Sequence, residues 1–173
     1  MLFVFLIILF ACHSIDATKY RLAVLRHGLT ALASDMNELA GWLRQSFEGI
    51  YVLSVEIDNG HEDSIIFPMN KQVDLFCQAV LSDANLKDGF NVLVVSQEGL
   101  IVRAAVEKCS LPAYSLITLV GIHQGVFGIP SVQFFPVPFR KLISKYAYED
   151  AVQNAISVAG YWRDPSQLDK YLA

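Results

Sequence analysis

The sequence predicts an α/β fold in which a mostly parallel sheet of about four strands carries helices on both faces. Short, uninterrupted apolar runs alternate with segments whose apolar residues recur at helical spacing. Strands without polar alternation are typical of parallel sheets that are buried on both faces. Hydrophobic residues make up 54% of the 173 residues and charged residues 17%, so the chain has enough apolar surface for a folded domain and is not intrinsically disordered.

The strands share an apolar or β-branched character, and we expect them at 22–25, 50–57, 92–95 and 115–120. Helices are predicted at 36–46, 70–82, 100–106 and, for the most part, 139–159. Asp35 and Glu38 have the spacing of a capping box at the start of the first helix. Trp42 lies on that helix and is predicted to be in the core. The polar segment 58–68 is predicted to be a loop.

The N-terminal segment has the features of a secretory signal peptide. Residues 1–12 are apolar without a break, too few for a membrane-spanning helix of about 20 residues, and the small residues Ser14 and Ala17 follow. We therefore expect a signal peptide at 1–17, a single domain at 18–173, entry into the secretory pathway and no stable membrane span. A buried N-terminal strand and a membrane anchor are the alternatives.

Removal of this segment would leave two cysteines, Cys77 and Cys109. Two cysteines in a secreted protein usually form a disulfide. Here the disulfide would close a loop of about 30 residues and stabilise the fold by roughly 3–4 kcal/mol. A pair of buried free thiols is the alternative.

Charge and composition exclude several classes of partner. The net charge is −4 and no Lys/Arg cluster is present, so the chain lacks the basic surface that nucleic-acid binding requires. His61, Glu62 and Asp63 are adjacent in the predicted polar loop, and we interpret them as a solvated surface. We expect no metal ion and no cofactor.

Ser96 follows the third predicted strand and precedes a predicted helix. A serine in this position can be a nucleophile, because a tight strand-to-helix turn lifts its hydroxyl above the sheet. The backbone N–H of Gln97 would then point toward a developing oxyanion, and the N–H of Leu29 is the candidate second donor. Alternatively, Ser96 is simply the N-cap of the following helix.

Longer segments resemble the palmitoyl-protein thioesterases, lysosomal enzymes of the α/β-hydrolase superfamily that remove fatty acyl groups from cysteine. The resemblance covers roughly residues 20–165, and its motifs are His27-Gly28, GIYVLSVEI at 49–57, CQA at 77–79, SQ at 96–97, HQGVFGIP at 123–130 and YW at 161–162. It implies a partial α/β-hydrolase fold whose C-terminal strands are missing. It also implies the Cys77–Cys109 disulfide.

The resemblance further implies hydrolysis of the thioester between a long-chain fatty acyl group and a protein cysteine. Ser96 would attack the carbonyl and form an acyl-enzyme, the N–H groups of Leu29 and Gln97 would form the oxyanion hole, and a His–Asp pair would act as the base. The implied substrates are S-acylated proteins or peptides and long-chain acyl thioesters. The implied location is the lysosome or the extracellular space.

The sequence departs from the pattern of the family. In the family elbow G-x-S-x-G-G, two glycines are replaced here by Val94 and Glu98, which we expect to crowd the turn and to place negative charge near the oxyanion. The triad Asp and His of the family lie beyond the point that matches Ala173, so both are absent from this chain. His123 is the sole histidine after Ser96, and we interpret it as a structural loop residue.

These departures leave two main hypotheses, an active thioesterase and a catalytically dead relative that binds acylated protein or lipid without turnover. A small secreted binding module is a third. We expect little or no turnover from the chain as written, because the loss of triad members costs several powers of ten in rate. Without further strands, the strand at 115–120 is expected to be an exposed edge.

Overall fold

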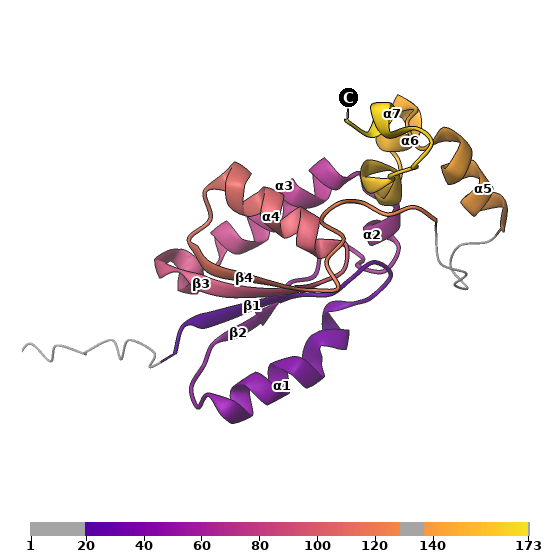
Figure 1. Cartoon of the computed structure of the whole chain (residues 1–173). Coiled ribbons are helices and arrows are strands. Elements are labelled where there is room, and N and C mark those ends of the chain that lie inside the picture. The colour runs from indigo at the N-terminus through magenta and orange to yellow at the C-terminus, as the bar shows by residue number, and fades with distance from the viewer. Residues whose placement is uncertain (1–19, 129–136, 173) are drawn as a thin grey trace, which may run out of the picture.

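A sheet of four parallel strands forms the centre of the computed structural model, which describes residues 20–128 and 137–172 (Figure 1). The strands are β1 (Leu22–Arg26), β2 (Val52–Ser54), β3 (Phe90–Val95) and β4 (Ala113–Leu119). They lie in the order β2-β1-β3-β4, and all three pairings are parallel. The predicted parallel sheet is therefore confirmed. The expected signal peptide at 1–17 lies outside the described residues.

Three longer helices cover the two faces of the sheet. Helix α1 (Asn37–Ser46) lies on one face, and α3 (Met69–Ser82) and α4 (Glu98–Cys109) lie together on the other (Figure 1). The helices expected at 36–46 and 70–82 are confirmed, and the one expected at 100–106 extends further at both ends. Helices on both faces were predicted from the apolar strands, and this prediction is also confirmed.

The face covered by α3 and α4 holds the larger hydrophobic core. Phe76 of α3, Ile101 of α4 and Phe90 of β3 are completely buried there. A disulfide between Cys77 and Cys109 joins the two helices, which confirms the predicted pairing. This face therefore combines dense apolar packing with a covalent cross-link.

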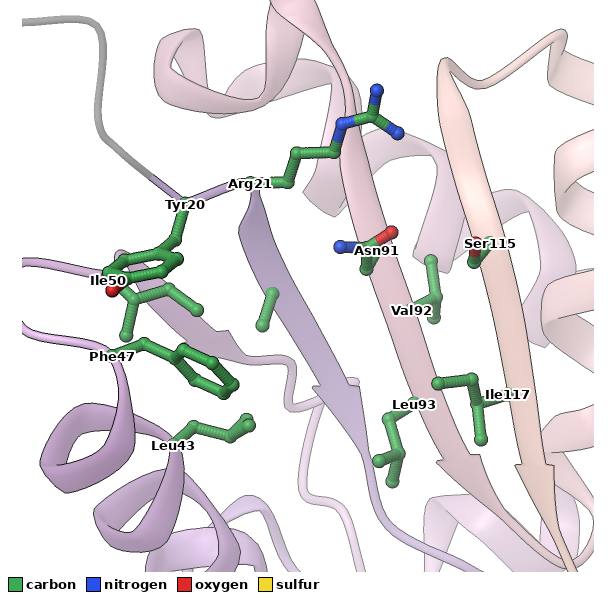
Figure 2. Close-up of a pocket in the computed structure, with 11 residues that line it drawn as sticks. Tyr20, Arg21, Leu43, Phe47, Ile50, Asn91, Val92, Leu93, Ser115 and Ile117 are labelled. Carbon is green, nitrogen blue, oxygen red and sulfur yellow. The ribbon is translucent and has the colours of Figure 1, made fainter.

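Helix α1 covers only part of the opposite face. Its residues Leu39, Ala40 and Leu43 pack against the sheet, and a groove of about 480 Å³ remains between α1 and the strands β3 and β4 (Figure 2). Trp42 lies outside this apolar stripe and is 57% exposed, so its predicted place in the core is wrong.

The start of α1 also differs from the prediction. Asp35 belongs to a 3-10 helix, η1 (Ala33–Met36), where its carboxylate accepts a hydrogen bond from the N–H of Leu32 at 2.8 Å. Helix α1 begins after Met36 without a side-chain cap. The predicted Asp35–Glu38 capping box is therefore wrong. The 3-10 turn η1 precedes α1, and Asp35 caps the start of that turn instead of the start of α1.

Other element boundaries were predicted less well. β2 is shorter than the expected strand at 50–57, and the expected loop at 58–68 contains a short helix, α2 (Asp63–Ile66). The remaining elements are η2 (Ala84–Asp88), α5 (Val137–Tyr146), α6 (Asp150–Gln153), η3 (Ser157–Tyr161) and α7 (Leu168–Leu172).

The helix expected at 139–159 is thus broken into three pieces. The side-chain amide of Gln153 donates to the carbonyl oxygens of Ala147, at 2.6 Å, and Ala159, at 2.7 Å. These bonds satisfy backbone carbonyls that a continuous helix would pair internally. The interruption brings Tyr161 and Trp162 into a second buried cluster with Ile143 of α5.

Strand β4 is the edge of the sheet in the described part of the chain. It pairs with β3 alone, and its side chains Ile117 and Leu119 are about half exposed. This observation agrees with the expected exposed edge. Among residues 20–128 and 137–172, no helix is both long and apolar enough to cross a membrane.

Candidate active site

The predicted nucleophile lies at the carboxyl end of β3. The two residues Ser96 and Gln97 connect β3 directly to α4. Ser96 has a φ of 56°, in the left-handed region that costs a non-glycine residue roughly 1–2 kcal/mol. Its backbone N–H donates to the carbonyl of Leu119 in β4 at 2.9 Å. The sheet therefore holds Ser96 in a strained, tight turn of the kind that a nucleophile elbow requires.

The alternative interpretation of Ser96 as a helix cap is wrong. Gln97 occupies the cap position of α4, and no side chain makes a capping hydrogen bond there. The hydroxyl of Ser96 is therefore not used to satisfy the backbone amides of the first turn.

The loop after β1 packs directly against this turn. A Cβ atom placed on Gly28 would lie 3.3 Å from the Cβ of Ser96 and 3.5 Å from the carbonyl oxygen of Val95. The approach of the two backbones therefore favours glycine at position 28. Because Leu29 is the next residue, the loop that carries the predicted second oxyanion donor lies against the Ser96 turn.

The backbone amides of Leu29 and Gln97 have no acceptor within the part of the chain that the structure describes. Among residues 20–128 and 137–172, neither N–H donates a hydrogen bond to another protein group, although those of Thr30 and Gly99 close by do. Gln97 also precedes the first turn of α4, whose N-terminus carries the positive end of the helix dipole. The absence of a protein acceptor for either N–H in this part of the chain is what the predicted oxyanion-hole role requires.

The two glycine replacements do not open the turn. Val94 is completely buried in the core on the α3–α4 face, and the turn after β3 keeps its left-handed residue. Glu98 is also completely buried, and its Oε2 lies 3.0 Å from Nε of Arg26 at the end of β1. The carboxylate that we expected to oppose the oxyanion is therefore paired with a guanidinium group.

Burial nevertheless destabilises the charged form of this carboxyl group. Desolvation raises the pKa of Glu98 to about 7, and the attraction of Arg26 offsets only part of that effect. Glu98 is thus a buried titratable group in the first turn after the nucleophile position. The pairing ties the end of β1 to the start of α4.

A second carboxylate holds the loop after β1. His27 is buried, its Nδ1 donates to the carbonyl of Gly28 at 2.9 Å, and its Nε2 lies 2.7 Å from Oε1 of Glu56. The other carboxylate oxygen of Glu56 accepts from the N–H of Ala33 at 2.6 Å. Both ring nitrogens of His27 are therefore engaged, so this imidazole orders the loop after β1.

The side chain of Gln97 is fixed from two directions. Its Nε2 donates to the carbonyl of Ser64 in α2 at 3.1 Å, and its Oε1 accepts from the hydroxyl of Tyr161 at 2.8 Å. Burial, with a smaller effect of Glu98, raises the pKa of Tyr161, so the hydroxyl remains a donor at physiological pH. Ser64 also accepts, through Oγ, from the N–H of Thr30 at 2.9 Å.

His123 lies close to α4 but is held by β4. Its Nε2 lies 2.9 Å from Oγ1 of Thr118, and a Cβ on Gly99 or Gly121 would meet its ring at 3.3 Å and 2.7 Å. The contacts of the ring are those of a packed loop residue. Its interpretation as a structural histidine remains a prediction.

Sequence reasoning missed Arg26, Glu56 and Ser64. A charged residue directly at the end of an apolar strand, as at Arg26, could have indicated a buried partner, whereas Ser64 gave no local signal. For metal binding, no cluster of three His, Cys, Asp or Glu side chains with suitable placement occurs in the described ranges.

Comparison with known proteins decides the family. A sequence profile described as "Palmitoyl protein thioesterase" matches residues 23–173. The chain belongs to this family. Palmitoyl-protein thioesterase 3 of Dictyostelium discoideum is 41% identical over 169 residues, which cover 96% of this chain and 57% of that protein. The lysosomal thioesterase PPT2 homolog of Drosophila melanogaster is 30% identical over 172 residues, covering 96% and 58%.

This thioesterase-family chain spans somewhat more than half the length of these relatives. Its fold resembles that of an extracellular α/β-hydrolase from a Paenibacillus species, with a TM-score of 0.54, 20% identity, and coverage of 78% of this chain and 53% of that one. Fold and family therefore agree: the described residues form part of an α/β-hydrolase fold, as predicted.

Proposed function

We propose that this chain carries the nucleophile and the oxyanion hole of a palmitoyl-protein thioesterase, an enzyme that hydrolyses the thioester between a long-chain fatty acyl group and a protein cysteine. The observation that carries the proposal is the strained Ser96 turn packed against Gly28, together with the amides of Leu29 and Gln97, which have no acceptor in the described part of the chain. Family membership supports the choice of a thioester as the substrate.

In the proposed reaction, Oγ of Ser96 attacks the acyl carbonyl and its proton passes to a base. The carbonyl oxygen becomes negatively charged and accepts hydrogen bonds from the two amides. The carbon–sulfur bond then breaks, the thiol leaves with a proton, and an acyl ester remains on Ser96. Water hydrolyses this ester and releases the fatty acid.

Among residues 20–128 and 137–172, no hydrogen bond joins the hydroxyl of Ser96 to a histidine or carboxylate that could act as its base. Both nitrogens of His27 are engaged by Gly28 and Glu56, and Nε2 of His123 contacts Thr118. We therefore propose that this chain alone is acylated slowly and turns over little thioester. The loss of a catalytic histidine leaves a residual rate enhancement of roughly 10³–10⁴ over water, which comes from the oxyanion hole and from binding.

The second candidate function is binding of acylated protein or lipid without turnover. Val94 and Glu98 in place of the elbow glycines favour it, together with His27, whose ring nitrogens are both engaged. The two candidates differ in one respect that can be measured, which is whether an acyl group becomes attached to Ser96.

The test uses the purified chain and p-nitrophenyl palmitate, whose leaving group needs no protonation. Free imidazole is added to supply the base, and peptide mapping by mass spectrometry locates the acyl group. We expect labelling at Ser96 that becomes faster as the imidazole concentration rises, is abolished by Ser96→Ala and is unchanged by Ser82→Ala on an exposed part of α3. Saturable binding of the ester without an adduct on Ser96 would favour the second candidate.

We also propose the location and organisation of the chain. The apolar segment at 1–12 supports a signal peptide at 1–17 that precedes a single domain at 18–173. A lysosomal relative and the Cys77–Cys109 disulfide support delivery through the secretory pathway to the lysosome.

A further inference from the structure

Ser64 contacts both halves of the candidate oxyanion hole. It lies in α2, far from Ser96 in the sequence, and is almost completely buried. Its Oγ accepts from the N–H of Thr30, at 2.9 Å, and its carbonyl oxygen accepts from Nε2 of Gln97, at 3.1 Å. One residue therefore joins the loop after β1 to the turn after β3.

The hydroxyl of Ser64 has a defined orientation. It donates its proton to the carbonyl of His61 at 2.8 Å, which leaves a lone pair for the N–H of Thr30. Thr30 itself has a φ of 62°, an unfavourable value for a β-branched residue. The hydrogen bond to Ser64 helps to hold this peptide in its unfavourable conformation.

We propose that Ser64 is a positioning residue that fixes the two amides of the oxyanion hole relative to each other. The bond to Thr30 restricts the peptide that directly follows Leu29, and the bond to Gln97 fixes the side chain of the other donor. The inference rests on the proposed function. It assigns to α2 a role in catalysis that requires no contact between Ser64 and the substrate.

Fixed donors are effective because they need no reorganisation when charge develops. Removal of one oxyanion donor costs roughly 10²–10³ in rate. Loss of the Ser64 hydroxyl leaves both donors present but less restricted, so the expected loss is smaller, about tenfold. Because Ser64 does not touch the acyl donor, the concentration of ester that half-saturates labelling should not change.

The experiment compares Ser64→Ala and Ser64→Thr with the matched variant Ser82→Ala. Ser82 is exposed on α3, and its Oγ donates to the carbonyl of Ala79 in its own helix. The imidazole-supported labelling of Ser96 is measured over a range of p-nitrophenyl palmitate concentrations. Ser64→Ala should lower the maximal rate constant about tenfold, Ser64→Thr should restore most of it, and Ser82→Ala should leave it unchanged.

An independent measurement follows the amides by NMR. In Ser64→Ala, the Thr30 amide should exchange with solvent faster and the Leu29 and Gln97 amide resonances should shift, whereas Ser82→Ala should not change them.

The inference is overturned if Ser64→Ala slows labelling only in proportion to the unfolded fraction, or raises the half-saturating concentration alone. If the unsubstituted chain is not labelled, the proposed function fails. The amide measurements then decide the inference alone, and unchanged exchange at Thr30 overturns it.

Discussion

The two faces of the sheet differ in how completely they are covered. On one face, α3 and α4 pack side by side, bury Phe76 and Ile101 completely and are joined by a disulfide. On the other, α1 packs over β1 and β2, and Ile117 of β4 borders the open groove (Figure 2). The face with complete packing also anchors the Ser96 turn, because α4 begins directly after it.

This difference means that packing on the α3–α4 face can hold the Ser96 turn in place although the other face of the sheet is partly open. Val94, Gln97 and Glu98 are completely buried around the turn. The groove extends from the opposite end of the strands, where Tyr20 and Asn91 line it, to Leu93 and Ile117 in the middle of β3 and β4. Changes in exposed residues that line the groove should therefore affect the fold and the site little, and changes in the core on the α3–α4 face should affect both.

The largest effect is expected from a matched pair of phenylalanine substitutions. Phe76→Ala removes a completely buried ring from the covered face and should lower the free energy of unfolding by about 3–5 kcal/mol. Phe47→Ala removes a ring that is 38% exposed beside the groove, and we expect a loss of about 1 kcal/mol. Urea unfolding measures both values, and equal losses would contradict the contrast between the faces.

The next prediction separates the contribution of the disulfide to stability from that of apolar packing. Replacement of both Cys77 and Cys109 by alanine opens a loop with a sequence separation of 32 residues and should cost about 3–4 kcal/mol of stability. The difference between Phe76→Ala and Phe47→Ala should persist in this background, because it originates in apolar burial. If the difference disappears, the disulfide and not the packing distinguishes the two faces.

The third effect is a pH dependence located at Glu98. Its pKa of about 7 in the folded chain exceeds the value of about 4.3 expected when unfolded, so the folded state binds the proton more tightly. The resulting stabilisation is fully present below pH ~4.3 and is lost as the pH rises to about 7, a change of at most about 4 kcal/mol.

Glu98→Gln should therefore reduce the decline of stability between pH 4.5 and 7, roughly the interval between the two pKa values. Glu107→Gln, at an exposed position of the same helix, should leave that decline unchanged. Unfolding measured at several pH values tests this expectation. An unaltered decline in Glu98→Gln would show that another group causes it.

Local sequence patterns predicted the elements well and the contacts between them poorly. The apolar runs located all four strands, and the stripe of apolar residues located α3, because both patterns follow from burial of one side of a periodic structure. The position of Trp42 was predicted wrongly because helical spacing does not show how wide the buried stripe of a helix is. The stripe of α1 that packs on the sheet contains Leu39, Ala40 and Leu43, and Trp42 lies outside it.

Ser96 and its two neighbouring amides could be identified because a strand, a serine and a helix are adjacent in the sequence. The Arg26–Glu98 and Ser64–Gln97 contacts could not, because each joins residues that only the folded sheet brings together. The same holds for the break in the C-terminal helix. It depends on side-chain bonds from Gln153 to carbonyls on both sides.

The most direct test of the account is a crystal structure of the chain labelled with a long-chain alkyl phosphonate, whose phosphoryl oxygen takes the place of the oxyanion. We expect the phosphorus on Oγ of Ser96 and the phosphoryl oxygen at about 2.7–3.1 Å from the backbone nitrogens of both Leu29 and Gln97. A label on another residue, or a phosphoryl oxygen that points away from these two amides, would contradict the assignment of Ser96 as the nucleophile.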